Sequence, residues 1–539
     1  MRTSASTLAL LVTGSLLACD AADPTLSLDQ SFEALSTDVF LDHMAELSVD
    51  GMKGRRPGTD GYDAAAAYIA EEAIELGLEP AGSGGSYLQP ITFRRATVEA
   101  GSPAFSVNGT ELRFGTDFSV APRTAATDVD LRAPIVFGGF GISAPDLGYD
   151  DFEGLDVAGK LVVVFPGAPD DFGSLERTVL SSSRTRDAEL RDRGAAGVIV
   201  IEEDDALSDS PRPRVRFEVP DGADAAARSA STELAVSISA SERVVADWFA
   251  RVGRSAEDVR ARIGSGQPSS FDMGADGHVR ARFAHETFES ANVAARLPGS
   301  DPALSAEHLV MTAHLDHLGV GEALNGDSIY NGTLDNASGS AALLTLASAL
   351  TRMDAPRRSV LFLWVTAEES GLLGSEYFAR FPTVPRENVV ANQNIDGVMG
   401  MIAAATDVLA FGYEHSNLSE AVDFAVARTG TPVSPDPTPE ENLFVRSDQY
   451  SFVREGIPAI WVQAGRSSVD PAIDAQGELD RWIEERYHKP TDDLDQPIDL
   501  AGVRAELENN LLVTWHIANE MGPIRWAPDS FLGRRWAGG

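Results

Sequence analysis

Apolar runs of two kinds alternate along the second half of the chain. One kind is apolar at nearly every position, which is typical of parallel strands buried on both faces: His308–Ala313, Ser359–Thr366, Val389–Ile395 and Ile457–Val462. The other kind repeats at helical spacing between or after these strands: Ser338–Leu350, Leu372–Phe378, Leu418–Thr429 and Ala501–Met521. This alternation predicts an α/β fold in which helices cover both faces of a mostly parallel sheet.

The first half of the chain has a different pattern. Thr37–Leu47 and Gly61–Leu76 have helical apolar stripes, and Tyr87–Phe93 reads as a strand. Between about 95 and 275, short β-like runs are separated by Gly, Pro and Asp. The strongest of these are Ala133–Phe140, Lys160–Phe165, Gly197–Ile201 and Leu234–Ile238, with a helix-like segment at Leu175–Arg193. No catalytic cluster occurs in this stretch, so we expect a β-rich module concerned with substrate access or interaction.

Histidine and carboxylate side chains follow the apolar runs directly. His314 and Asp316 come after the first strand, and Glu368 and Glu369 come after the second. Asp335 opens the Ala/Leu-rich helix between them. Ligands of open α/β sheets gather outside the carboxyl ends of parallel strands, so these clusters predict one shared site.

Two later residues complete a set of candidate metal ligands. Asp396 in NQNIDG and His488 in RYHKPTDD join His314, Asp335 and Glu369. A pair of cations about 3.5–4 Å apart needs a bridging carboxylate and a few further nitrogen or oxygen ligands on each ion. Mixed imidazole and carboxylate ligands suit zinc, whereas magnesium and calcium favour shells made of oxygen alone.

Glu368 and Asp316 are expected to support this metal site. Adjacent residues at a strand end point in different directions, so Glu369 can bind metal while Glu368 faces the open coordination position. There Glu368 would act first as general base and then as general acid. Asp316 is placed to accept the remaining ring N–H of His314 and so fix its tautomer.

Each of these residues also has an ordinary structural explanation. Asp335 could be a helix cap, and the Glu368–Glu369 pair could be a solvated face. Asp396 could cap a turn, and His488 could be a surface residue before Pro490. Their joint position after apolar elements of one domain favours the metal site.

Composition excludes several classes of function. The chain has 82 acidic and 43 basic residues, a net charge of −39, which argues against binding to nucleic acid or to an anionic membrane face. A solvated, self-repelling surface explains this acidity. The single cysteine, Cys19, lies in the N-terminal segment, so no thiol is left for a disulfide or for a nucleophile in the body of the protein.

The N-terminal segment has the pattern of a secretory signal. Arg2 precedes an apolar run from Leu8 to Leu17 that is too short to span a bilayer. Residues Leu16–Cys19 read LLAC, which resembles the bacterial lipobox and implies a lipidated mature N-terminus; an unmodified secreted protein is the alternative. We therefore expect a signal peptide over 1–19, an acidic linker over 20–36, and a place in the bacterial cell envelope, with contact to the membrane only through the lipid anchor.

The motifs resemble, in order, those of the co-catalytic di-zinc aminopeptidase family, which includes bacterial leucine aminopeptidase and aminopeptidase Y. They are AHLDHLG, GTLDNASG, TAEESGLLGS, NIDG, SDQYSF, GIPAI and YHKPTDD, and GRRPGT with its following helix matches the N-terminal part of the family. The resemblance implies a three-layer α/β/α peptidase domain over 37–95 and 280–525. VAGKLVVVF followed by RDRGAAGVIVI resembles a protease-associated domain, which implies an insert over 96–279; an unrelated β-rich insert is the alternative.

Carried over by position, the resemblance assigns a role to each candidate. His314 and Asp396 would hold one zinc ion, Glu369 and His488 the second, and Asp335 would bridge the two. Glu368 takes the position of the general acid and base, and Asp316 the supporting position beside the ligands.

The chain also departs from the family. Thr333 replaces the usual Ala before the bridging position, and Gln449 replaces the His of the SDHxxF motif. Tyr450 is a candidate donor to the oxyanion, with simple packing as the alternative. Glu440 and Glu441 are candidates for binding a free α-amine.

The sequence therefore predicts a zinc-dependent exopeptidase that acts on peptide substrates, with an aminopeptidase as the leading interpretation. Arg446 leaves open a metallocarboxypeptidase of the same fold, because such an enzyme needs a cation to bind a terminal carboxylate. A non-catalytic binding or receptor protein and an aminoacyl cyclase or amidohydrolase are further alternatives. The complete ligand set together with Glu368 argues against a non-catalytic scaffold, and the oligomeric state is not specified by the sequence.

Overall fold

The computed structural model describes residues 25–223, 233–468, 470 and 472–537. The expected signal peptide and Cys19 lie outside the described residues. Among the helices in these ranges, none has both the length and the apolar character needed to cross a membrane.

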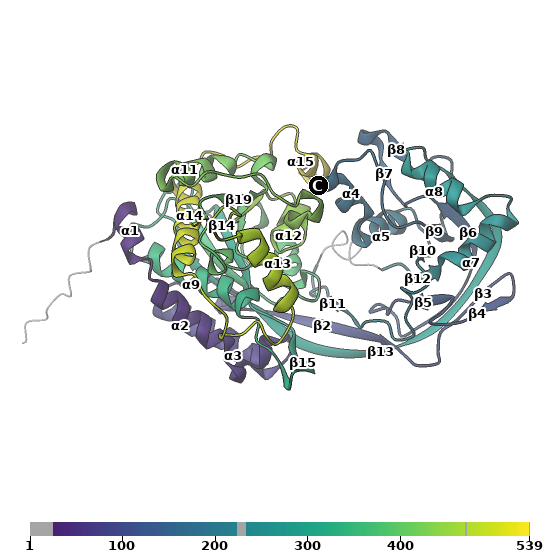
Figure 1. Ribbon diagram of the computed structural model, residues 1–539, viewed down its shortest axis with the longest axis horizontal. Coiled ribbons are helices and arrows are strands. Elements are labelled where there is room, and N and C mark those ends of the chain that lie inside the picture. The colour runs from purple at the N-terminus through teal and green to yellow at the C-terminus, as the bar shows by residue number, and fades with distance from the viewer. Residues whose placement is uncertain (1–24, 224–232, 469, 471, 538–539) are drawn as a thin grey trace, which may run out of the picture.

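Two lobes are joined by long strands (Figure 1). The strand β13 (Ser270–Leu297) runs from one lobe into the other, with β2 (Leu88–Val98) paired antiparallel along its second half. The lobe with both chain-terminal segments holds the candidate ligands and is called the peptidase lobe. The second lobe is built from residues 104–282, except for Arg214–Phe217, which pair with β2 and pack against Tyr377 of the peptidase lobe.

The centre of the peptidase lobe is a mixed, mostly parallel sheet. Its order is β19–β20–β18–β14–β17–β13. The inner strands are parallel: β14 (His308–His314), β17 (Ser359–Val365), β18 (Val389–Asn394) and β20 (Ala459–Ala464). At the two edges, β13 and β19 (Val408–Phe411) run antiparallel to their neighbours. This confirms the predicted fold class.

Both faces of this sheet are covered, as the uninterrupted apolar strands predict. Leu309, Met311 and Ala313 of β14 face a core shared with α2 (Thr37–Ser48), α3 (Asp60–Glu75), α9 (Gly339–Thr351), α11 (Ser419–Thr429) and α14 (Leu500–Asn519). The intervening Val310 faces the opposite core, shared with α10 (Leu373–Arg380) and α12 (Gln449–Arg454). The result is a three-layer arrangement.

The second lobe continues the sheet in the order β13–β6–β9–β10–β12–β5. These strands are β5 (Phe118–Val120), β6 (Asp128–Gly138), β9 (Leu161–Val164), β10 (Gly197–Glu202) and β12 (Val236–Ser241). The predicted helix over Leu175–Arg193 is divided into α4 (Ser174–Ser181) and α5 (Ser183–Asp192), because Ser182 accepts a hydrogen bond from the backbone of Thr185 and caps the second helix. The sequence did not predict α7 (Glu242–Arg251) or α8 (Ala256–Gly264).

The boundary expected near residue 280 falls inside β13. Up to Arg282 this strand pairs with β6, and from Phe283 it pairs with β2. A single strand therefore belongs to both lobes, and the division at 96–279 stays a prediction.

The predicted linker over 20–36 is wrong for its second part. Leu28–Ala34 forms helix α1, and Leu35 is buried in the core of the peptidase lobe. Arg504 of α14 fixes the end of this helix by donating to the carbonyls of Phe32 and Leu35. Leu28, Phe32 and Leu35 form one helical stripe, which is too short to stand out in an acidic segment.

The remaining described elements are short or lie at the edges. They are β1 (Glu79–Pro80), β3 (Ala104–Val107), β4 (Thr110–Leu112), β7 (Ser143–Ala144), β8 (Tyr149–Asp150), β11 (Arg214–Phe217), β15 (Gly319–Leu324), β16 (Asp327–Tyr330), α13 (Ala475–Glu485) and α15 (Phe531–Trp536).

Arg55, in the GRRPGT segment, ties the N-terminal region to the loops that follow β14 and β16. Its side chain is fully buried and donates to four backbone carbonyls, those of Leu47 (2.6 Å), Leu315 (2.8 Å), Asn331 (2.6 Å) and Gly332 (2.9 Å). Leu315 follows the ligand candidate His314, and Gly332 precedes the turn that carries Asp335. One side chain thus sets the spacing of two ligand loops.

The turn that presents Arg55 requires a glycine at position 54. Gly54 has a φ of +63°, and a Cβ there would lie 2.3 Å from the carbonyl oxygen of Tyr330 and 2.7 Å from that of Gly319. The close approach of the two backbones explains why GRRPGT is a turn and not a continuation of α2.

We expect Arg55→Met to lower the free energy of unfolding by about 3–5 kcal/mol, because it leaves buried carbonyls without a donor. Urea unfolding followed by circular dichroism measures this. The matched control is Arg56→Met, which replaces the exposed neighbouring arginine and should change the value by less than about 0.5 kcal/mol. Equal losses in the two variants would contradict a structural role specific to Arg55.

Candidate metal centre

The candidate ligands come from the ends of adjacent strands. His314 is the last residue of β14, and Glu369 and Asp396 lie just beyond β17 and β18. Because β17 and β18 pair with β14 on either side, their carboxyl ends meet at one edge of the sheet. Asp335 lies in the turn η4 (Thr333–Ser338) before α9, and His488 lies in the loop after α13.

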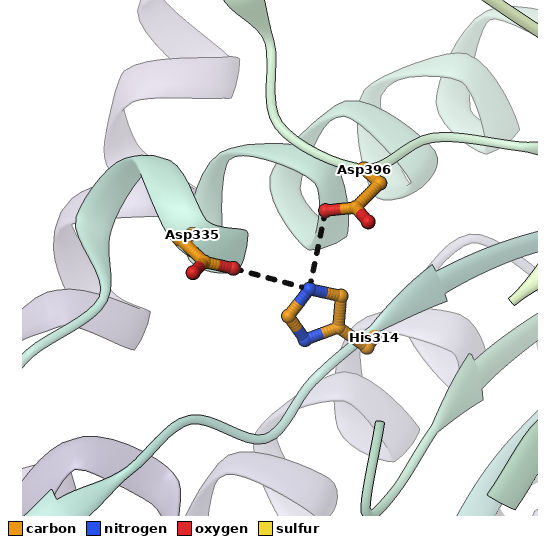
Figure 2. Close-up of side chains that lie close together, drawn as sticks. All are labelled: His314, Asp335 and Asp396. Carbon is orange, nitrogen blue, oxygen red and sulfur yellow. Dashed lines mark hydrogen bonds and ion pairs between the residues drawn. The ribbon is translucent and has the colours of Figure 1, made fainter. Parts of the chain in front are cut away.

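The first cluster forms around the ring of His314 (Figure 2). Its Nε2 atom lies 3.2 Å from Asp335 Oδ1 and 3.2 Å from Asp396 Oδ1. The ring is buried, and Nδ1 lies 3.0 Å from the backbone carbonyl oxygen of Asp316, which orients it. These three side chains can converge on one cation.

The second cluster shares Asp335 with the first. His488 Nε2 lies 3.2 Å from Asp335 Oδ2 and 3.2 Å from Glu369 Oε2. Asp335 therefore directs one carboxylate oxygen to each cluster, which is the arrangement that a bridging ligand needs. All five residues that the sequence predicts as ligands are thus brought together.

His317 is a further member of the second cluster that sequence reasoning missed. Its Nδ1 atom lies 2.8 Å from Glu369 Oε1 and 3.9 Å from Asp335 Oδ2, and the ring is buried. His317, Asp335 and Glu369 can converge on one cation. The signal was present in AHLDHLG, where a second histidine follows the first by three residues.

Electrostatics at the two clusters follow from burial and proximity. Burial favours the neutral His314 ring, yet Asp396 and Asp335 raise its pKa well above the usual value. Burial likewise opposes ionisation of Asp335, but hydrogen bonds from His314 and His488 hold its pKa well below the usual value. Despite burial, Asp335 and Glu369 raise the pKa of His488 to about 10. The carboxylates therefore bind positive charge strongly at this place.

The donor set fits zinc. Imidazole nitrogens and carboxylate oxygens are zinc ligands, and both kinds occur in each cluster. Within the described part of the chain, Asp335 Oδ2 and His317 Nε2 are buried without a well-aligned hydrogen bond. Such buried polar atoms are costly unless a partner satisfies them, and a cation between the clusters would satisfy the carboxylate oxygen.

Asp316 supports the site in a different way from the one predicted. Its backbone carbonyl, not its carboxylate, contacts the ring of His314. The carboxylate instead accepts hydrogen bonds from the backbone N–H groups of Glu368 (3.0 Å) and Glu369 (3.4 Å). Asp316 follows β14 by two residues, so its side chain reaches across to the end of β17.

Glu368 lines a cavity together with the ligand candidates His314, Asp335, Asp396 and His488. Burial raises its pKa well above the usual value, and the neighbouring carboxylates of Glu369, Asp448 and Asp396 raise it further. A carboxyl group with a raised pKa holds a proton more readily, which suits a group that accepts and returns one. Asp448, in the SDQYSF motif, is a buried carboxyl group that the sequence did not single out.

Asp492 positions the bridging candidate through the backbone. Its carboxylate accepts hydrogen bonds from the N–H groups of Leu334 (3.0 Å) and Asp335 (3.1 Å). Its own carbonyl accepts from Thr333 (3.1 Å), so Thr333, which departs from the family pattern, is held through its backbone. Asp492 lies four residues after His488, and the YHKPTDD motif therefore supplies both a ligand candidate and its support.

A cavity of about 440 Å³ opens onto the clusters. Apolar walls come from Leu443, Trp461, Leu479, Trp482 and Ile483. Its polar lining outside the clusters includes Asp436, Glu441, Asp480, Arg446 and Arg466. Glu440, the other candidate for amine binding, is exposed and is not part of this lining.

The structure does not place Tyr450 or Gln449 at this cavity. Tyr450 is buried, and its ring packs edge-on against Trp536 at a centroid distance of 5.7 Å. Gln449 is buried too, and it accepts a hydrogen bond from Asn394 (2.7 Å) and donates one to the carbonyl of Phe444 (2.7 Å). Tyr450 therefore packs against Trp536 outside the cavity lining, and its contact with the oxyanion stays a prediction.

Comparison with known proteins agrees with this geometry. Residues 292–514 match the sequence model of peptidase family M28. Leupeptin-inactivating enzyme 1 of Streptomyces exfoliatus is 28% identical over 226 residues, which are 40% of this chain and 47% of that protein. Leucine aminopeptidase 1 of Trichophyton equinum is 26% identical over 207 residues, which are 36% of this chain and 54% of that protein. The chain thus spans about half the length of these curated relatives.

A solved structure shows the same fold. The aminopeptidase from Aneurinibacillus sp. strain AM-1 superposes with a TM-score of 0.51 at 18% sequence identity, and the match covers 94% of this chain and 99% of that one. The segment that matches the family model contains all the candidate ligands and Glu368. Residues 292–514 are therefore similar to peptidase family M28, within a chain that has the fold of a known aminopeptidase.

Proposed function

We propose that this protein is a zinc-dependent exopeptidase that removes N-terminal residues from peptides. The observation that carries the proposal is the position of Asp335. Its two carboxylate oxygens each lie 3.2 Å from an imidazole nitrogen, one belonging to His314 and the other to His488. A carboxylate shared between two histidine-containing clusters suits a pair of metal ions.

We propose two zinc ions at this place. His314 and Asp396 would hold one ion, Glu369 and His488 the other, and Asp335 would contact both. His317 is close enough to Glu369 and Asp335 to join the second set. When bound, zinc acts as a Lewis acid on the scissile carbonyl and increases the acidity of water.

The proton transfers are assigned to Glu368. Its carboxylate accepts a proton from the attacking water and then gives it to the nitrogen of the leaving amine, so that the peptide C–N bond breaks. Asp316 keeps this side chain in place by holding the backbone of Glu368. Glu368 is partly buried and lines the cavity, where its side chain can reach a bound substrate.

The polar side chains of the cavity favour an aminopeptidase over a carboxypeptidase. Arg446 donates to Glu441 at 2.9 Å, so the cation that suggested carboxylate binding is paired with an acid. Arg466 donates to the carbonyl of Ala464 and lies among acidic groups that include Asp436 and Asp480. The outer carboxylates are suited to a positively charged α-amine, and the apolar walls are suited to an apolar N-terminal side chain.

The remaining parts of the prediction rest on sequence resemblance. We propose that residues 96–279 form a protease-associated insert that controls substrate access. Limited proteolysis tests the insert, because an independently stable module would survive cleavage at its edges. We also propose that the protein is anchored in the bacterial cell envelope through Cys19.

Glu368→Gln should lower kcat for leucyl-anilide hydrolysis by at least about 10³-fold while the zinc content stays near that of the unaltered protein. Steady-state kinetics and atomic emission spectroscopy measure the two quantities. Glu387→Gln, at an exposed glutamate on the peptidase lobe, is the matched control and should leave both unchanged. Full activity in Glu368→Gln would remove the proposed base.

A free α-amine should be required in the substrate. Leucyl-anilide should be cleaved, its N-acetyl form should not, and removal of zinc by a chelator should abolish cleavage until zinc is restored. Chromatography of the products measures this. Release of the C-terminal residue from N-blocked peptides would instead assign the protein as a carboxypeptidase.

Mass spectrometry of the mature protein should find residue 19 at the N-terminus with a lipid attached. Cys19→Ser should remove the lipid and release the protein from the membrane fraction. An unmodified mature N-terminus elsewhere would contradict the anchor without affecting the proposed activity.

A further inference from the structure

A second cavity, of about 680 Å³, lies between the two lobes and is lined by arginine. Among the residues that the structure describes, its lining contains eight arginines and four carboxylates. The whole chain has the opposite balance, with 82 acidic and 43 basic residues. Positive charge is therefore concentrated here against the trend of the protein.

On the side of the peptidase lobe, a single carboxylate faces three guanidinium groups. Glu376 of α10 lies 3.3 Å from Arg184, 3.5 Å from Arg380 and 3.7 Å from Arg454. Arg184 belongs to α5 of the second lobe, so this group of charges spans both lobes. Arg184 and Arg454 therefore share one carboxylate, whose single negative charge cannot neutralise both.

Elsewhere in the cavity, Glu233 likewise forms ion pairs with two arginines. It lies 3.5 Å from Arg123 and 3.4 Å from Arg214. Arg216, two residues further along β11, donates to the backbone carbonyl of Val215 (2.9 Å). The cavity thus carries excess positive charge on both of its walls.

Burial makes this excess costly. It lowers the pKa of Arg216 to about 10, and Arg214 and Arg184 lower that pKa further. It also lowers the pKa of Arg123 to about 10, although Glu233 acts in the opposite direction. At neutral pH these side chains remain charged, so the folded protein holds poorly solvated cations that a counter-ion would stabilise.

We propose that this arginine cavity binds a small anion that carries several phosphate or carboxylate oxygens. Guanidinium groups present paired N–H donors that match such oxygens two at a time. The volume is within the range of small-molecule sites. An anion seated here would contact arginines of both lobes and would fix the lobes relative to each other.

The cavity is connected to the loop that carries Glu368. Arg184 donates to the carbonyl of Gly371 at 2.8 Å, and the N–H groups of Gly371 and Leu372 donate to the carbonyl of Glu368 at 2.7 and 2.8 Å. An anion that binds the Arg184 guanidinium would therefore affect the hydrogen bonds that hold Glu368 in place. This consequence depends on the proposed function, whereas anion binding itself does not.

Calorimetric titration of the full chain with pyrophosphate and with propane-1,2,3-tricarboxylate, at constant ionic strength, tests the proposal. We expect one site per chain, and the tighter of the two anions identifies phosphate or carboxylate as the preferred chemistry. Arg216→Gln in β11 and Arg454→Gln in α12 should each weaken binding at least about tenfold. Arg132→Met, at an exposed arginine of β6 outside the cavity, should bind as the unaltered protein does.

A variant of the metal centre separates the two sites. His314→Ala should impair zinc binding but should leave the affinity for the anion unchanged. The proposal is overturned if the unaltered protein binds neither anion, if both arginine variants bind as tightly as it does, or if binding disappears in His314→Ala. Circular dichroism of each variant shows whether it is folded, and variants in two different elements, β11 and α12, keep the test valid if one of them is not.

Discussion

The burial of Arg55 is the interaction on which the candidate metal centre depends. The centre gathers carboxylates from separate loops into a region from which water is largely excluded, and such a group of like charges repels itself strongly there. Burial lowers the pKa of Arg55 to about 10, while Asp492, Asp316, Asp335 and Glu369 act to raise it. Arg55 thus offsets part of the negative charge and, through its four carbonyl partners, holds the loops at the distance that the clusters require.

Hydrogen bonds from backbone N–H groups to two carboxylates also fix the loops that carry the candidate ligands. Asp316 holds the N–H groups of Glu368 and Glu369, and Asp492 holds those of Leu334 and Asp335. In both cases a carboxylate from one loop fixes the main chain of another, so the side chains of the clusters approach in defined directions. Rigid positioning of this kind is what a metal site needs from the residues around its ligands.

The sequence predicted those ligand candidates whose positions follow from the pattern of the strands. His314, Glu369 and Asp396 each follow a continuous apolar run, and the pairing of β17 and β18 with β14 brings those ends together. Asp335 and His488 lie in turns without such a pattern, and their roles followed from resemblance to a family.

The contacts that sequence reasoning missed are between residues far apart in the chain. Arg55 donates to the carbonyl of Leu315, which lies 260 residues away. Every residue has a main-chain carbonyl, so the sequence does not indicate which of them accepts such a hydrogen bond. The role of Asp316 differed from the expectation because the ring of His314 is oriented by the adjacent carbonyl, which any residue would supply. Strand β13 was missed because its polar alternation reads as several short runs when the pairing with both lobes is not known.

The two cavities show how one strongly acidic chain divides its charge. The metal centre buries carboxylates that need cations, and the arginine cavity buries guanidinium groups that need anions. Burying charge of one sign is expensive, so a ligand of the opposite sign would stabilise each cavity. The arginines come from residues 94 to 454 and converge only because β2 and β13 hold the lobes side by side. The net charge of the sequence averages over both cavities and shows only the acidic excess. The fold separates the two signs and places them at either end of the segment from Glu368 to Glu376 in α10.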